Sequence, residues 1–256
     1  MSQWVRRGLL SGVRSTAYPA AREAAAGVSP GLPVGGVRAP AEGAALAACC
    51  PTGALTQHAS ELLVDNRRCI HCFRCVRAVA APLGLSDDYE WAVWGQATQS
   101  RRALGRPFHR SVHVIVVDAG DCGACLQEVR QLNNPYYNMH RLGFFITPTP
   151  RHADVLLVVG SVTDHMRAAL EHTYAAMPGP KRVVAVGACA LTGGLFAPSF
   201  VSEGGVARVL PVDVEVPGHP PPPLAILHGL LVAVGRAMPT TLGASPLNPV
   251  TGTSHG

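Results

Sequence analysis

Apolar runs alternate with longer, mixed stretches through the second half of the chain. Three runs rich in β-branched residues read as buried strands of a parallel sheet: "VHVIVVDAG" (112–120), "ADVLLVVGS" (153–161) and "KRVVAVGAC" (181–189). Helices are predicted after them, over about 124–132, 164–177 and 224–238. Strand–helix alternation of this kind favours an α/β fold with a parallel sheet and right-handed crossovers.

A weaker fourth strand is predicted over 207–218, where Pro211 interrupts the apolar pattern. Proline lacks the N–H that a central strand donates, so this strand is expected at the edge of the sheet. The stretch ends in "VPGHPPPP", whose four consecutive prolines hold the chain stiff behind His219.

The rest of the chain has little periodicity, and it divides by composition. Residues 1–45 are predicted to form an irregular N-terminal arm, and 46–85 a loop-rich domain with five cysteines. Residues 86–111 read as a linker with an aromatic patch. Residues 112–238 form the α/β domain, and 239–256 a flexible tail rich in Pro, Gly, Ser and Thr.

Composition narrows the classes of function. The chain has 256 residues, is 48% hydrophobic and carries a net charge of +5, with Lys181 as its only lysine. No basic cluster with interleaved aromatics is present, so we expect no nucleic-acid partner. No apolar run approaches the roughly 18 residues of a membrane span, and the N-terminus has no sustained apolar segment typical of a signal peptide. A cytoplasmic location is therefore predicted, where eight cysteines favour metal binding over disulfides.

The first cysteine group is "CIHCFRC", with Cys69, Cys72 and Cys75. Thiolates at C-x2-C-x2-C spacing can each reach a different iron of a cubane cluster, and the fourth ligand in such folds is a remote cysteine followed by proline. Cys50 in "CCPTGAL" fits this description. A zinc site is the alternative, but this spacing is awkward for one tetrahedral ion. We therefore predict a [4Fe–4S] cluster, with Cys49 as a spare cysteine.

These residues resemble a bacterial-type ferredoxin that keeps one of two clusters. The second cluster would need cysteines at four positions that hold other residues, namely Pro40, Gly43, Leu46 and Val79. The motifs "SGVRSTAYP", "CPTGAL", "RCIHCFRC" and "YEWAVW" also resemble, in the same order, the ferredoxin subunit of formate hydrogenlyase-type complexes. The resemblance implies an N-terminal α+β ferredoxin-like domain.

The second group comprises Cys122 and Cys125 in "DCGAC", Cys189 in "GACALTGGLF", and His219. Cys122 and Cys125 follow the first predicted strand, Cys189 lies at the end of the third, and His219 follows the fourth. Because the carboxyl ends of parallel strands meet at one edge of a sheet, we expect these four side chains to lie together. Three cysteines leave one iron of a cubane without a protein ligand, and His219 is the candidate for that iron.

This half of the chain resembles the small subunit shared by group 4 [NiFe] hydrogenases and respiratory complex I, the 20 kDa-type subunit. The resemblance rests on "CGAC", "TPTPRHADVLLVVGSVT", "GACALTGGLF" and "PVDVEVPGHPPPP". It implies a flavodoxin-like parallel sheet and a second [4Fe–4S] cluster, close to the active site of a separate large subunit. In the family the last motif reads Pro-Gly-Cys-Pro-Pro, so His219 stands in place of a cysteine.

The substitution leaves two interpretations open. As a ligand, the neutral imidazole of His219 makes the cluster less negative and raises its potential, as histidine does in Rieske centres. Alternatively the second cluster is lost and the subunit is structural. Three retained cysteines favour the ligand.

We therefore predict an electron-transfer subunit of a membrane-associated [NiFe]-hydrogenase or formate hydrogenlyase-type oxidoreductase. The resemblance implies a large subunit, membrane subunits and other electron-transfer subunits as partners, at the cytoplasmic side of the membrane. A complex I-like quinone reductase subunit is the alternative, although the two residues between Cys122 and Cys125 favour the hydrogenase branch. We find no nucleophile–base pair and no nucleotide-binding motif. His58, His71 and His109 are interpreted as surface or interface residues.

Overall fold

The computed structural model describes residues 2–78, 82–97, 108, 110–196 and 198–240. Its main element is a six-stranded sheet in the order β4-β9-β8-β7-β5-β6. The strands are β4 (Val93–Trp94), β5 (Val112–Asp118), β6 (Phe144–Ile146), β7 (Val155–Val159), β8 (Arg182–Val186) and β9 (Val214–Val216). Every neighbouring pair from β6 to β9 is parallel, and only β4 pairs antiparallel, with β9. The predicted α/β class with a parallel sheet is confirmed.

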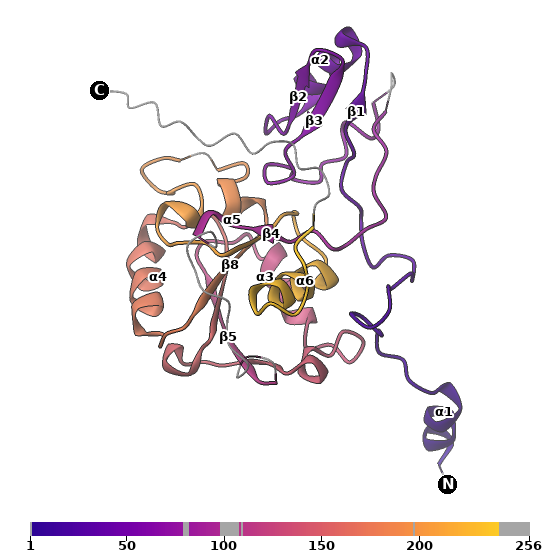
Figure 1. Cartoon of the computed structure of the whole chain (residues 1–256), viewed down its shortest axis with the longest axis vertical. Helices are drawn as coiled ribbons and strands as arrows, with labels where there is room; N and C mark the ends of the chain where they lie inside the picture. Colours follow the sequence, from indigo (N-terminus) through magenta and orange to yellow (C-terminus); the bar gives the residue numbers. More distant parts are fainter. Residues whose placement is uncertain (1, 79–81, 98–107, 109, 197, 241–256) are drawn as a thin grey trace.

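Helices cover both faces of this sheet (Figure 1). Helix α4 (Asp164–Ala176) lies on one face, and α3 (Ala124–Gln131) and α6 (Pro223–Ala233) lie on the other. Shorter helices connect the strands: α5 (Ala188–Thr192), η3 (Met139–Leu142), η4 (Pro150–His152) and η5 (Val206–Arg208). Successive residues of a strand point to opposite faces, so the central strands β5, β7 and β8 contribute to two cores.

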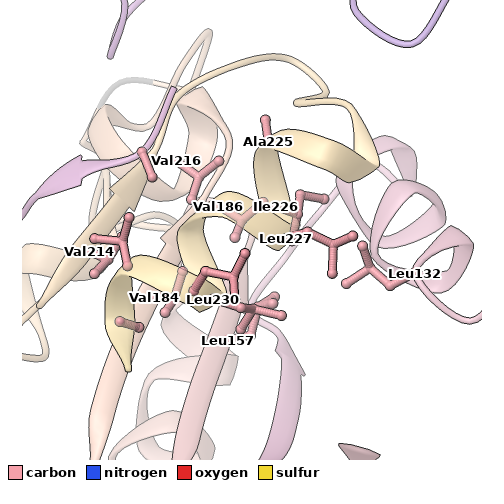
Figure 2. Close-up of a cluster of buried hydrophobic side chains, with 14 of the residues drawn as sticks. Leu132, Leu157, Val184, Val186, Val214, Val216, Ala225, Ile226, Leu227 and Leu230 are labelled. Carbon is pink, nitrogen blue, oxygen red and sulfur yellow. The ribbon is translucent and has the colours of Figure 1, made fainter. Parts of the chain in front are cut away.

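Figure 2 shows the core beneath α6. Ile226, Leu227 and Leu230 of the helix pack against Leu157 of β7 and Val184 of β8. Leu156 and Val183, one position away, belong to the opposite core together with Leu170 of α4. All residues of both strands are buried and, apart from Arg182 at the start of β8, all are apolar, which explains the hydrophobic runs in the sequence.

A smaller unit precedes the main sheet. It is an antiparallel sheet in the order β1-β3-β2, formed by β1 (Gly36–Val37), β2 (Leu55–His58) and β3 (Glu61–Val64). Helix α2 (Pro40–Cys49) packs against β2 and β3. Four buried leucines form its core: Leu46, Leu55, Leu62 and Leu83.

The structure differs from the sequence-based expectation in several elements. The segment predicted as an irregular arm contains helix α1 (Gln3–Ser11) and the start of α2. The stretch predicted as a linker supplies β4, and because β4 lies outside β9, the fourth strand is not the edge strand that Pro211 suggested. Pro211 precedes β9 instead of interrupting it.

The final helix ends at Ala233, because Gly235 adopts a left-handed conformation just beyond it. Residues 241–256 of the predicted tail lie outside the described residues. Within the described part of the chain, no helix combines the length and apolarity needed to cross a membrane.

Candidate metal centres

The four cysteines predicted for the first site lie around one pocket. Cys50, Cys69, Cys72 and Cys75 all line one pocket, which has a cavity volume of about 20 Å³. The rest of its wall is mostly apolar: Pro33, Ala54, Leu55, Val64, Ile70 and Phe73, with Thr52 and Arg74. Cys49 is not among the residues that line this pocket. The structure thus brings together a motif loop and a residue from the end of α2.

Backbone geometry explains how three cysteines of one short loop reach the same pocket. His71 and Phe73 have φ angles of 51° and 56°, in the left-handed region that residues other than glycine seldom adopt. Two such residues in one loop turn the chain twice within a few positions. Backbone strain of this kind persists only where the surrounding structure holds it, and it concentrates at functional sites.

Cys50 sits where α2 ends, and its sulfur accepts hydrogen bonds. The Ala54 N–H donates to Cys50 Sγ at 3.2 Å, and Thr52 Oγ1 lies 3.7 Å from the same sulfur. Burial alone would raise the pKa of Cys50, but the donors of Thr52, Ala54 and Leu55 outweigh it and lower the pKa. A thiol in this setting is prepared for the thiolate form, and N–H···S bonds of this type tune iron–sulfur clusters.

The donor set of the first site fits a cubane cluster, because four thiols around one pocket supply one sulfur for each iron. Among the described residues, no three His, Cys, Asp or Glu side chains, at this site or at the second, are placed to hold a single metal ion. Desolvation raises the pKa of Cys69 to about 11, and the charges of Cys75, Cys50 and Cys72 add to the increase. Clustered buried thiols of this kind are suited to bound cations, which deprotonate their thiol ligands.

The second group of predicted residues lies at the carboxyl edge of the parallel strands, as expected. Cys122 follows β5, and Cys125 is in the first turn of α3. Cys189 is in the first turn of α5, directly after β8, and His219 follows β9. Cys125 and Cys189 are buried, whereas Cys122 is exposed.

Contacts and charge link these residues across their separate loops. Cys189 Sγ lies 3.9 Å from His219 Nδ1. Burial raises the pKa of Cys189 to about 11, and the charges of Cys122 and Asp121 raise it further. Burial also raises the pKa of Cys125, with smaller contributions from Asp121, Cys189 and Cys122. Each of the three cysteines therefore lies within electrostatic reach of the others.

Two glycines make room for this arrangement. Gly187, between β8 and α5, has a φ of 90°, and a Cβ there would lie 2.5 Å from Cys125 Sγ. Gly160, after β7, has a φ of 92°, and its Cβ would meet the backbone of Gly120 and Asp121 at 2.5 Å. Both positions require glycine, for conformation and for space. The loops after β5, β7 and β8 approach one another closely only because of them.

Asp121 is a residue of this site that sequence reasoning missed. Its Oδ2 accepts the N–H groups of Gly123 and Leu126, at 3.0 Å each, and thereby caps the start of α3. Helix N-termini favour negative charge, which explains an acidic residue here. An aspartate just after a strand and before a helix was the available signal.

The structure also places several other polar residues of the chain. Thr163 occupies the N-cap position of α4, but its side chain makes no capping hydrogen bond. Ser161 is buried, and its carbonyl accepts the hydroxyl of Ser202. His71 is buried beside Trp91, at the junction between the small unit and the main sheet, rather than on the surface. His109 lies outside the described residues.

Comparison with known proteins places these sites in context. Residues 122–233 match the protein family described as the NADH ubiquinone oxidoreductase 20 kDa subunit. The chain is 44% identical over 129 residues to an uncharacterised protein of Methanocaldococcus jannaschii, covering 50% of this chain and 86% of the relative.

Two relatives have informative names. A probable membrane-bound hydrogenase subunit of Pyrococcus furiosus is 39% identical over 137 residues, covering 54% of this chain and 82% of the relative. Formate hydrogenlyase subunit 7 of Escherichia coli is 38% identical over 135 residues, which is 53% of each chain. The matched family region contains Cys122, Cys125, Cys189 and His219, whereas the first cysteine site lies outside it.

Proposed function

Because the chain belongs to the family of the NADH ubiquinone oxidoreductase 20 kDa subunit, whose members are subunits of oxidoreductase complexes, we propose that it carries electrons through two iron–sulfur clusters. The observation that carries the proposal is the gathering of Cys122, Cys125, Cys189 and His219 at one edge of the parallel sheet. A [4Fe–4S] cluster, when bound, accepts and releases single electrons.

In the first site, Cys50, Cys69, Cys72 and Cys75 hold a [4Fe–4S] cluster. Their pocket supports this assignment, as does the Ala54 N–H aimed at the Cys50 sulfur. The apolar wall keeps water from the sulfurs, which together with the N–H···S bonds sets the reduction potential. The small antiparallel unit around it acts as a one-cluster, ferredoxin-like domain.

In the second site, Cys122, Cys125 and Cys189 hold a second [4Fe–4S] cluster, and His219 supplies the fourth ligand. The position of His219 Nδ1, 3.9 Å from the Cys189 sulfur, supports its inclusion in the set. The stiff proline run behind His219 limits the freedom of the imidazole. Exposure of Cys122 leaves this site open on one side, where a partner subunit can approach.

The names of the relatives suggest the assembly. One is a subunit of a formate hydrogenlyase and another of a probable membrane-bound hydrogenase. By extension, this chain works beside a large subunit that holds the catalytic site, with membrane subunits and further electron-transfer subunits, at the cytoplasmic side of the membrane. Single electrons pass between the first site, the second site and the large subunit.

Iron counting in cysteine variants tests the proposal. The full chain, purified anaerobically with its partners, is expected to contain eight irons and eight acid-labile sulfides, counting this chain alone. Cys72→Ala removes a ligand of the first site and Cys122→Ala a ligand of the second, so each is expected to lose one paramagnetic centre while keeping the other. Electron paramagnetic resonance of the reduced protein distinguishes the two losses.

Cys49→Ala is the matched control, because Cys49 neighbours Cys50 but does not line the pocket. It is expected to keep both centres. A wild-type chain with a single centre that survives Cys122→Ala would mean that the second site is empty. The chain would then be a structural subunit with one cluster.

A further inference from the structure

The hydrophobic cores of the two units do not merge at the first cysteine site. Leu46, Leu55 and Leu62 belong to a cluster that is separate from the two clusters of the main sheet. The loop that carries Cys69, Cys72 and Cys75 follows β3, the last strand of the small unit. Its position relative to the second site must therefore depend on specific contacts at the junction.

A buried ion pair forms one of these contacts. Arg67 Nε lies 2.8 Å from Glu215 Oε2, and Arg67 Nη2 donates to Glu215 Oε1 at 2.9 Å. The pair therefore combines a charge-assisted hydrogen bond from Nη2 with a close ionic contact of Nε, which itself makes no hydrogen bond. The Glu215 side chain is only 5% exposed and that of Arg67 is 22% exposed. Arg67 precedes Cys69 by two residues, and Glu215 precedes His219 by four.

Backbone contacts hold Arg67 in place on both sides. The Arg67 carbonyl accepts the hydroxyl of Thr192, the last residue of α5, at 3.3 Å. The Arg67 N–H donates to Asp65 Oδ1 at 3.0 Å, and the Asp65 N–H donates to the Ala54 carbonyl at 2.8 Å. Arg67 thus connects the loops of Cys50, Cys189 and His219 through a short series of hydrogen bonds.

His71 forms a second anchor, two residues after Cys69. Its ring packs edge-on against Trp91, with 5.5 Å between the ring centroids. Trp91 is 1% exposed and belongs to the core beneath α6. The His71 Nε2 atom is buried and has no hydrogen-bond partner in the described part of the chain. The Cys69 loop is therefore fixed to the main sheet on both sides of its first cysteine.

From these contacts we propose that Arg67 and Glu215 are positioning residues, which lock the first cysteine site onto the second at a fixed separation and orientation. The inference rests on the proposed electron-transfer function. It adds the contact that holds the two sites in a fixed arrangement. An ion pair is suited to this role because its geometry is directional, whereas an apolar contact tolerates sliding. Neither residue is a ligand, so the ion pair between Arg67 and Glu215, called the lock below, acts through the loops that carry the ligands.

Neutral, similarly sized variants test the lock. Arg67→Gln and Glu215→Gln each leave the other partner buried without its counter-charge, whereas the double variant leaves two amides. In the single variants, both centres are expected to remain, with unchanged iron content. The magnetic interaction between the two reduced centres, which depends on their separation and orientation, is expected to weaken and to become heterogeneous. The double variant is expected to be no worse than either single variant, because the two residues act as a pair.

Hydrogen exchange tests the same lock without relying on the clusters. In either single variant, amide protection in peptides covering 61–75 is expected to fall by about 10²-fold or more, the loss expected when one partner of a buried ion pair is removed. Arg167→Gln is the matched control, because Arg167 pairs with Glu171 and Glu203 on the exposed surface of α4. It is expected to change neither measurement.

The outcomes separate the two proposals. Wild-type protein with one paramagnetic centre contradicts the proposed function. The hydrogen-exchange measurement still tests whether Arg67 and Glu215 hold the Cys69 loop in place. Unchanged magnetic interaction and unchanged protection in both single variants, with both centres present, overturn the lock alone.

Discussion

The two cysteine sites differ in how the chain assembles them. Cys69, Cys72 and Cys75 lie in a single loop, and only Cys50 comes from another element. The second site takes its side chains from loops after three different strands, from Cys122 to His219. A small unit with four core leucines supports the first, and a six-stranded sheet with two cores supports the second. We therefore expect order at the first site to depend on a bound group, and order at the second to depend on the fold.

Removal of iron is expected to have the largest effect on local stability, and to destabilise the small unit more than the main sheet. The core of the small unit has only four buried leucines among the described residues, so we expect bound metal to contribute much of its folding free energy. After anaerobic chelation, hydrogen exchange is expected to show loss of protection over 46–64, while the β7 and β8 amides stay protected. Retained protection over 46–64 would contradict this difference between the regions.

Gly187→Ala is expected to disable the second site by steric means. The new Cβ would lie 2.5 Å from Cys125 Sγ, at a φ of 90° that alanine adopts with strain. Strain of this type costs about 1–3 kcal/mol, and the sulfur must move as well. We expect four irons instead of eight, with the first centre intact.

The control for this variant is Gly179→Ala, since a Cβ at Gly179 meets no atom within 4 Å. Normal iron content is expected there. Eight irons in Gly187→Ala would show that the close approach of Gly187 and Cys125 is unimportant for the site.

His219→Cys is expected to change the reduction potential of the second cluster rather than the iron content of the protein. A thiolate in place of a neutral imidazole makes the cluster more negative, so its reduction potential should fall by on the order of 100 mV. The first centre should not shift, which a redox titration followed by paramagnetic resonance can measure. His219→Ala is expected to lose iron from the second site. Unchanged iron and potential in His219→Ala would remove His219 from the ligand set.

The smallest expected effect concerns His228, in α6 of the main sheet. Its Nδ1 accepts the Ala92 N–H at 3.2 Å, and Nε2 lies 2.9 Å from the Met238 carbonyl, an arrangement that fits the neutral ring. Burial lowers the pKa of His228, and the opposing charges of Glu90 and Asp88 only reduce that shift.

A lowered folded-state pKa means that the unfolded chain binds the proton more readily. The stability from neutral His228 is therefore present above the ordinary value of 6.5 and lost as the pH falls below it. The loss is limited to about 1.4 kcal/mol per pH unit for one proton. In thermal unfolding, His228→Gln is expected to flatten this part of the pH dependence. An identical slope in the variant would assign it to other groups.

Much of the main sheet could be predicted because its central strands, β7 and β8, are buried on both faces. Their apolar runs, and that of the partly buried β5, identify these strands in the sequence. Strand polarity then predicts that Cys122, Cys189 and His219 share an edge, and the structure places them there. Two-residue strands such as β4 carry no periodicity, which is why the sequence around Val93–Trp94 indicates a linker rather than a strand.

The sequence by itself determined the sheet, the cysteine motifs and the edge where the second group meets, because these follow from local patterns and strand direction. Only the tertiary structure decided that Arg67 pairs with Glu215 and that His71 packs on Trp91. Neither pair has a sequence signature, because the partners lie far apart along the chain and come from different units. Their contact depends on how two separately patterned units dock, and side-chain spacing along one element contains no information about that.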